Sequence, residues 1–413
     1  MGRSRSLLWR YYLFRVTNTS GFFLPVAMII LQHKGFGLGF IGLAYGVYAF
    51  AKILLEVPTG YVGDWLGRRS SLAVGSAVRV LVLGSYPFVD TAAVYLGVHV
   101  LWAVGRSFRS GTQDAWLYEL LQARFDEGEF ARIESRGSLA KLVVDAATAM
   151  GAGVLYTVEP ALPFVATAAI AAVGIPILYA FPSIDRLRTE SDDASLDSDR
   201  DVLTVGDALD MLRIQLRRPQ VRWFVLFASL FYSLFVVTRL YEQPALDTIG
   251  IPVTGFGVLY AGFKIFSAGM ASTVGWLQDR LGTKGVMLSL IPIYGLAYAS
   301  IALSPLLVVP VLFLNRGLNT IVRPVRNQYL NDRVADVGRA TVLSGASMAL
   351  AVIGGSARLA AGWATELLGP VGFLPWAGVT LATAAGILWL FASPVRHPDV
   401  SEGGSSASAT MAE

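Results

Sequence analysis

Cysteine is absent from this sequence, and only three histidines occur among its 413 residues. The chain therefore has no disulfide bond, thiol nucleophile or cysteine-ligated metal, and little from which to build a histidine-based metal site. It also lacks a phosphate-binding glycine loop followed by lysine and serine or threonine, which argues against direct coupling to ATP. No nucleophile and base, paired metal ligands or cofactor motif emerges, so we expect no metal, no cofactor and no enzyme.

Charge is scarce as well, because Asp, Glu, Lys and Arg make up only 15% of the chain. In contrast, 54% of the residues are hydrophobic and the mean hydropathy is +0.56, well beyond the apolar share of a soluble domain. We attribute the formal net charge of +4 to membrane topology, not to affinity for nucleic acid. The composition indicates a polytopic protein of the lipid bilayer, without a nucleic-acid partner, and we expect a monomer.

Long apolar segments recur along the whole chain. About 20 apolar residues are needed for each crossing, so these segments predict twelve transmembrane helices. They lie near residues 13–31, 38–62, 71–88, 92–120, 138–156 and 161–181, and then near 223–241, 254–277, 286–303, 306–330, 340–367 and 371–391. The predicted fold class is an all-α polytopic membrane protein.

A polar segment divides the twelve predicted helices into two sets of six. We expect one six-helix unit over residues 1–185, a cytoplasmic linker over 186–220, a second unit over 221–393 and a disordered tail over 394–413. Within the linker, four apolar residues at helical spacing predict a surface helix. These residues are Val205, Leu209, Leu212 and Leu216.

Basic residues concentrate at both termini and in the loops that follow the even-numbered spans. The alternate loops carry chiefly His33, Lys34, Asp90, Glu159, Glu242, Asp247 and Glu366. Because cytoplasmic loops carry the excess of Lys and Arg, this distribution places both termini and the linker in the cytoplasm. We expect a multi-pass protein of the plasma membrane.

One short pattern occurs twice, each time at the end of the second helix of a set. Residues 60–69 read GYVGDWLGRR, and residues 275–284 read GWLQDRLGTK. The shared positions pair Gly60 with Gly275, Asp64 with Asp279, and Gly67 with Gly282, and only the first copy ends in Arg68 and Arg69. A small residue at a helix end lets a neighbouring helix approach, the aspartate can cap a turn, and the cations hold the turn at the membrane surface.

Two sets of six helices with this pattern after the second helix of each resemble the major facilitator superfamily. The first copy matches that family's pattern in full, whereas the second has Thr283 in place of the first cation. The resemblance implies two pseudo-symmetric six-helix bundles around a central cavity, with alternating access by rocking of one bundle against the other. It also implies that these turns form a cytoplasmic gate, in which Asp64 meets a helix N-terminus or an arginine of the other half when the cavity opens outward.

Polar side chains form a stripe along the fourth and the tenth predicted helices. Along the fourth, the spacing puts His99, Trp102, Arg106, Arg109, Gln113 and Trp116 on one face, and along the tenth it does so for Arg316, Asn319, Arg323 and Arg326. An ionised side chain at mid-membrane costs about 2.5–3.5 kcal/mol, so these stripes must face a wet cavity or a partner.

In the family that this chain resembles, the first, fourth, seventh and tenth helices line the cavity. The resulting candidate set is Arg15, Asn18, Trp102, Arg106, Arg109, Gln113, Tyr232, Phe235, Arg239, Arg316, Asn319 and Arg323. For Arg106 and Arg316, a structural ion pair and a role in substrate or proton coupling both stay open. For Arg109, Arg323 and Arg326, nearer the helix ends, we favour the structural interpretation.

Three acidic residues within the spans are candidates to carry a proton: Asp114, Glu56 and Asp145. Asp114 is the first choice because it adjoins the stripe of the fourth helix. Glu56 and Asp145 each follow a lysine by four residues, Lys52 and Lys141, so internal neutral pairs are the competing interpretation.

The sequence therefore predicts a secondary active transporter of a small organic molecule, with proton-coupled efflux as the first hypothesis. The surplus of arginine over acidic residues in the expected cavity motivates an alternative, uptake or exchange of organic anions. A receptor or scaffold that does not transport is the hypothesis from another class.

Overall fold

The computed structural model of the chain describes residues 2–110, 112–122, 127–181, 219–332 and 339–395. Helices and the turns between them account for all the secondary structure within these ranges. The predicted linker helix, at Val205, Leu209, Leu212 and Leu216, and the predicted disordered tail both lie outside the described residues.

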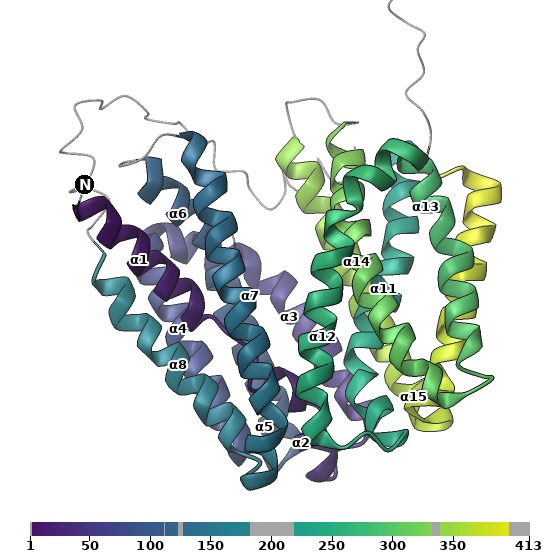
Figure 1. Cartoon of the computed structure of the whole chain (residues 1–413), viewed down its shortest axis with the longest axis horizontal. Coiled ribbons are helices and arrows are strands. Elements are labelled where there is room, and N and C mark those ends of the chain that lie inside the picture. The colour runs from purple at the N-terminus through teal and green to yellow at the C-terminus, as the bar shows by residue number, and fades with distance from the viewer. Residues whose placement is uncertain (1, 111, 123–126, 182–218, 333–338, 396–413) are drawn as a thin grey trace, which may run out of the picture.

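The first half of the chain forms one bundle. Its elements are α1 (Gly2–Thr17), η1 (Leu24–Val26), α2 (Ile29–His33), α3 (Leu38–Leu66), α4 (Arg68–Ser85), η2 (Tyr86–Phe88), α5 (Ala92–Arg109), α6 (Thr112–Gln122), α7 (Glu127–Val158) and α8 (Leu162–Tyr179). Figure 1 shows this bundle beside the second one.

The second half forms the other bundle. Its elements are α11 (Pro219–Thr248), α12 (Val253–Ser272), α13 (Val274–Ser300), η3 (Pro305–Leu307), α14 (Val308–Asn331) and α15 (Arg339–Ala392). The long α15 consists of two helices that meet at Gly369. By length and composition, eight helical segments among the described residues are able to cross a membrane. The all-α architecture in two bundles is the predicted one.

The first predicted span is not a continuous helix, which corrects the sequence prediction. α1 ends at Thr17, and helical structure resumes only at η1. The hydroxyl of Thr17 and the amide of Asn18 both donate to the carbonyl of Phe14, at 2.8 and 3.0 Å. Such local bonds compete with the helical ladder, and Pro25 could not donate to that ladder in any case.

The fourth predicted span is also broken. α5 ends at Arg109, Ser110 is extended with ψ 123°, and α6 begins at Thr112. Trp116, which the spacing placed on the polar stripe, is instead buried in a hydrophobic cluster between Phe14 and Phe181. The expected continuous polar face therefore stops at Arg109 and resumes, reoriented, on α6.

The repeated pattern adopts the same turn in both bundles. Gly67 has φ 79° and ψ 151°, and Gly282 has φ 62° and ψ 171°. Only glycine adopts this combination without strain. The shared glycine at the eighth position of each copy therefore has a definite conformational cause.

The two ends of the bundles differ in how closely they meet. We call the end that holds residues 60–69 and 275–284 the motif end, and the opposite end the far end. At the far end α3 packs on α15 and α7 packs on α12, and the bundles converge there in Figure 1. A Cβ on Gly42 would lie 2.7 Å from the Cα of Gly362, so the two helix backbones touch.

At the motif end the repeated glycines face open space. A Cβ added to Gly60, Gly67, Gly275 or Gly282 would meet no atom within 4 Å. Two aromatic side chains of the first copy are largely exposed, Tyr61 at 76% and Trp65 at 83%. The close approach of a neighbouring helix that we expected at Gly60 and Gly275 is thus absent in this conformation.

Candidate transport site

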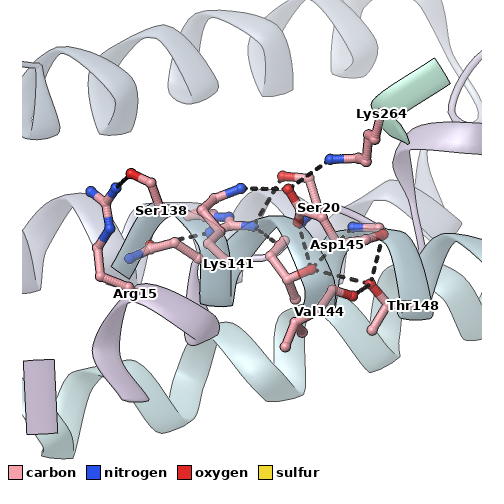
Figure 2. Close-up of polar contacts among 12 residues, drawn as sticks. Arg15, Ser20, Ser138, Lys141, Val144, Asp145, Thr148 and Lys264 are labelled. Atoms are coloured by element: carbon pink, nitrogen blue, oxygen red, sulfur yellow. Dashed lines mark hydrogen bonds and ion pairs between the residues drawn. The ribbon is translucent and has the colours of Figure 1, made fainter. Parts of the chain in front are cut away.

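Asp145 anchors the break in the first helix. Its Oδ1 accepts hydrogen bonds from the hydroxyl of Thr19 at 2.7 Å and from the backbone N–H of Ser20 at 2.9 Å. Its Oδ2 accepts from Lys141 at 2.6 Å and from Lys264 at 2.9 Å (Figure 2). The side chain is buried, so four donors satisfy a carboxylate removed from water.

Lys264 makes this cluster a connection between the bundles. Lys141 and Asp145 are both on α7, four residues apart, and form the predicted internal pair. Lys264 comes from α12 of the second bundle and contacts the same carboxylate oxygen. Asp145 thus pairs once within its own helix and once across the interface, while a role as proton carrier stays a prediction.

Two arginines converge on the other side of the helix break. Arg79 of α4 donates to the carbonyl of Thr19, and Arg109 of α5 donates to the side-chain oxygen of Asn18. Arg109 also lies 3.4 Å from the side-chain oxygen of Gln113. The structure thereby brings together Asn18, Arg109 and Gln113, as predicted, and neither arginine forms an ion pair with a described carboxylate.

Arg15 forms an ion pair within the first bundle. Its Nη2 lies 2.7 Å from Glu134 and 2.7 Å from the hydroxyl of Ser138 on α7. Tyr11 donates to the same Glu134. These contacts support a structural role for Arg15, which the sequence had placed in the substrate cavity.

Glu242 and Arg316 form the corresponding pair in the second bundle. Arg316 Nη2 lies 2.6 and 2.7 Å from the two carboxylate oxygens, and the guanidinium stacks 5.3 Å from the ring centres of Tyr260 and Phe263. Glu242 is 1% exposed and lies within α11. This corrects the sequence analysis, which had placed Glu242 in a loop because it follows the apolar run that ends near residue 241.

Two other candidate arginines have solvent-accessible side chains. Arg106 on α5 and Arg239 on α11 are both accessible, and neither pairs with a carboxylate among the described residues. Tyr48 of α3 lies within electrostatic reach of Arg106 and also of Arg358, which comes from α15 of the opposite bundle. One arginine from each bundle therefore interacts electrostatically with this tyrosine.

Two of the remaining cavity candidates, Tyr232 and Trp102, interact with Tyr48. Tyr232, on the same helix as Arg239, is also within electrostatic reach of Tyr48. Trp102 packs against Phe23, with ring centres 5.6 Å apart. Three further candidates are accessible to different degrees: Phe235 and Asn319 are half-buried, and Arg323 is exposed.

Of the other two proton-carrier candidates, only the side chain of Glu56 is described. It is exposed, lies 3.5 Å from Lys52 and accepts from the hydroxyl of Ser110 at 3.2 Å. The predicted pair with Lys52 is therefore formed. Asp114 lies on α6, but its side chain is outside the described part of the structure, so its role stays a prediction.

Arg69, a cation of the repeated pattern, contacts its own bundle. Arg69 donates to the carbonyl of Tyr179 on α8 and stacks 4.8 Å above the ring of that residue. Arg68 begins α4 directly after Gly67, and Asp279 is exposed. The side chain of Asp64 is not among those described, so its expected contact with the other half stays a prediction.

Sequence reasoning missed four charged residues of the site. They are Arg79, Glu242, Lys264 and Arg358. Arg79 and Lys264 carried a usable signal, since each is an isolated cation within an apolar span. Glu242 follows Arg239 by three residues and so shares its helical face, which would have shown that the seventh helix extends further.

Comparisons with known proteins agree with this architecture. The profile described as Major Facilitator Superfamily matches residues 11–343. An uncharacterized MFS-type transporter of Bacillus subtilis (strain 168), YxaM, is 23% identical over 244 residues, and the match spans 58% of each protein. At such identity and coverage the relative says nothing of the substrate of this chain.

Solved structures share the fold at low sequence identity. The nucleoside transporter NupG aligns with TM-score 0.73 and 14% identity over 95% of this chain and 98% of its own. A bacterial homologue of the iron transporter ferroportin, in its inward-facing state, aligns with TM-score 0.70 and 15% identity over 94% of this chain and 98% of its own. With a profile that covers most of the sequence and two bundles of the expected plan, this chain belongs to the Major Facilitator Superfamily of membrane transporters.

Proposed function

We propose that this transporter carries an organic anion by alternating access. The observation that supports this most is the pair of exposed guanidinium groups at Arg106 and Arg239, one on each bundle, without a carboxylate partner among the described residues. Arginine binds carboxylates and phosphates through a planar set of donors. A substrate that is held between the two bundles during alternating access would contact binding groups from both of them.

The acidic residues of the helices leave this positive charge uncompensated. Glu134, Asp145 and Glu242 are each engaged by Arg or Lys. A cationic substrate would need a free carboxylate. Of the proton-carrier candidates whose side chains are described, Asp145 is engaged by two lysines, and the exposed Glu56 is paired with Lys52. The charge distribution therefore favours the alternative of an organic anion over a lipophilic cation.

Aromatic side chains lie close to Arg106. Trp102 lies one helical turn before it and packs 6.4 Å from Tyr48, and both rings are half-buried. Rings next to a cation offer apolar area together with charge neutralisation. An anion that carries an aromatic ring fits this combination.

We place the motif end at the cytoplasm, because that end carries the excess of Lys and Arg. The bundles touch at the far end and not at the repeated pattern, so this conformation exchanges substrate with the cytoplasm. Efflux stays our expected direction, and the plasma membrane our expected location.

Thermal unfolding of the purified protein tests the charge preference with three ligands built on one ring: benzoate, benzamide and benzylamine. We expect benzoate to raise the melting temperature, and the neutral and cationic compounds to leave it unchanged, because a ligand that binds the folded state stabilises it. The variant R106A/R239A should lose the response, whereas R132A, which removes an exposed arginine of α7, should keep it.

Equal stabilisation by benzylamine, or a full response in R106A/R239A, would contradict the proposal. Proteoliposomes loaded with benzoate then separate transport from binding alone. Release that depends on Arg106 and Arg239 indicates a transporter, whereas binding without release favours a receptor.

A further inference from the structure

The side-chain oxygen of Asn18 lies between two guanidinium groups. Arg109 of α5 donates to this oxygen through Nη2, and Nη1 of Arg79 on α4 lies 3.4 Å from it. The orientation of the amide is fixed, because its nitrogen donates to the carbonyl of Phe14 at 3.0 Å. Two cations of the first bundle therefore share an uncharged acceptor at the place where an anion would compensate both.

The packing of α4 on α5 brings the two arginines together. A Cβ on Gly75 would lie 2.5 Å from Cγ of Arg109 and 2.9 Å from the carbonyl of Gly105. Because Gly75 has no side chain, the stem of Arg109 lies directly on α4. Gly75 precedes Arg79 by four residues and shares its face of the helix, so Arg109 is directed toward Arg79.

Much of each guanidinium group is left without a hydrogen bond. Arg79 also donates to the carbonyl of Thr19 and lies 3.5 Å from the hydroxyl of Ser20. Arg109 lies 3.4 Å from the side-chain oxygen of Gln113. Nε of both arginines and Nη1 of Arg109 form no hydrogen bond within the described ranges. A guanidinium has five N–H groups and neither side chain is fully buried, so both arginines can bind a further acceptor.

The positive charge of the two arginines is not balanced by the described residues. Asp145 is within electrostatic reach of Arg79. Its carboxylate already binds Lys141 and Lys264, so it cannot neutralise a third cation as well. Arg106 adds another positive charge within reach of both arginines. Like charges removed from water repel strongly, and an uncompensated ion is destabilising.

We propose that a chloride ion, or another monovalent inorganic anion of similar size, binds between Arg79 and Arg109 as a counter-ion of the first bundle. A monatomic anion accepts from N–H groups in any direction, so it can use the donors that the neutral acceptors leave free. All described hydrogen-bond partners of the two guanidinium groups belong to the first bundle. The ion therefore keeps its ligands when the bundles rock, unlike a substrate held between them, and the proposal does not depend on transport of an organic anion.

Thermal unfolding of the full-length protein in detergent tests this site without any substrate. Chloride replaces the bulkier anion gluconate stepwise at constant ionic strength. We expect the melting temperature to rise and then to saturate, because an ion that binds the folded state stabilises it. R79Q/R109Q should lose this rise. R132Q, which removes an exposed arginine that is paired with Glu129, should keep it.

Two results of this experiment would overturn the proposal. The first is a wild-type melting temperature that is the same in chloride and in gluconate. The second is an equal rise in R79Q/R109Q, which would indicate an adventitious ion only.

The variant N18D supplies the missing charge from within the chain. It puts a carboxylate oxygen where the two arginines share the amide oxygen, so we expect a higher melting temperature in gluconate than that of the wild type, without a response to chloride. The substitution also removes the N–H group that binds Phe14, which by itself lowers stability and cannot produce the rise. N18A supplies no charge and should keep the response to chloride. A full chloride response in N18D would overturn the proposal.

Binding of radioactive chloride to the purified protein separates this site from the proposed substrate site. We expect one saturable site per chain, absent from N18D and from R79Q/R109Q. R239A, which alters the proposed substrate site in the second bundle, should retain it, and benzoate should not compete with it. Loss of chloride in R239A, or competitive displacement by benzoate, would overturn the proposal. If benzoate does not bind the wild type, the proposed function is contradicted, and this measurement still decides whether the chloride site exists.

Discussion

The far end and the motif end both depend on glycine, yet the glycines act differently. At the far end, Gly42 and Gly362 lie where two helix backbones touch, and a side chain has no room. At the motif end, Gly67 and Gly282 have ample room but a backbone conformation that only glycine adopts readily. One end is therefore built for contact between the bundles, and the other for a sharp turn within each bundle.

Polar contacts follow the same division. The far half of the interface holds two contacts between the bundles: Lys264 binds Asp145, and Gln243 binds the backbone of Leu24 and Met28. At the motif end, Arg69 instead contacts Tyr179 of its own bundle. These contacts indicate that the protein is closed at the far end in this conformation. The motif end, which lacks such contacts among the described residues, can close in another state.

The largest effect should follow from a side chain at the far-end contact. In G42L, a Cβ would lie 2.7 Å from the Cα of Gly362 and 2.8 Å from the carbonyl of Arg358, which are backbone atoms that cannot rotate away. Such overpacking costs about 3 kcal/mol in the closed state only, so the far end should stay open and transport should fall more than tenfold. Flux in proteoliposomes measures this. G97L, whose added Cβ would meet no atom within 4 Å, is the control, and equal activity of the two variants would refute the contact.

A smaller effect should follow from K264A. It removes a charge-assisted hydrogen bond of about 1.5–3 kcal/mol that exists only while the far end is closed. K141A removes the other lysine from the same oxygen of Asp145, but that bond lies within α7 and is present in both states. We expect K264A to open the far end and K141A to lower only the melting temperature. Identical behaviour of the two variants would show that the contact of Lys264 with Asp145 does not selectively stabilise the state with a closed far end.

The smallest effect concerns the repeated glycines. G67A and G282A should each destabilise the protein by about 1–2 kcal/mol, because alanine is strained at positive φ. G60A and G275A place alanine in an exposed helix, where it is favoured over glycine, and should not lower stability in this conformation. Chemical denaturation compares the four variants, and equal losses at all four positions would contradict the division of roles.

Apolar length and the repeated pattern were enough to predict the two bundles, since each helix must cross a bilayer of fixed thickness. The predicted pair of Lys141 and Asp145 was also recoverable, because its spacing is local. Lys264 was not, since its partner lies 119 residues away and no local rule connects the two. The break after Thr17 was missed because hydropathy does not register that Thr17 and Asn18 bond to the backbone.

The sequence predicted which kinds of residue the candidate site contains better than it predicted their contacts. The stripe on the fourth helix predicted that Arg106 and Arg109 share one face of that helix, but the break after Arg109 changed the surroundings of Trp116. Arg316 was left between a structural and a functional role. The structure pairs it with Glu242, which supports the structural role, while a role in transport stays a prediction.

The most direct measurement of the central claim is the distance across each end of the protein in lipid. Because the chain contains no cysteine, spin labels can be attached to T157C and L303C at the far end, and to S135C and S272C at the motif end, all exposed positions. We predict a short far-end and a long motif-end distance in the wild type, and the reverse in G42L. Far-end and motif-end distances that do not change in opposite directions would contradict alternating access through these contacts.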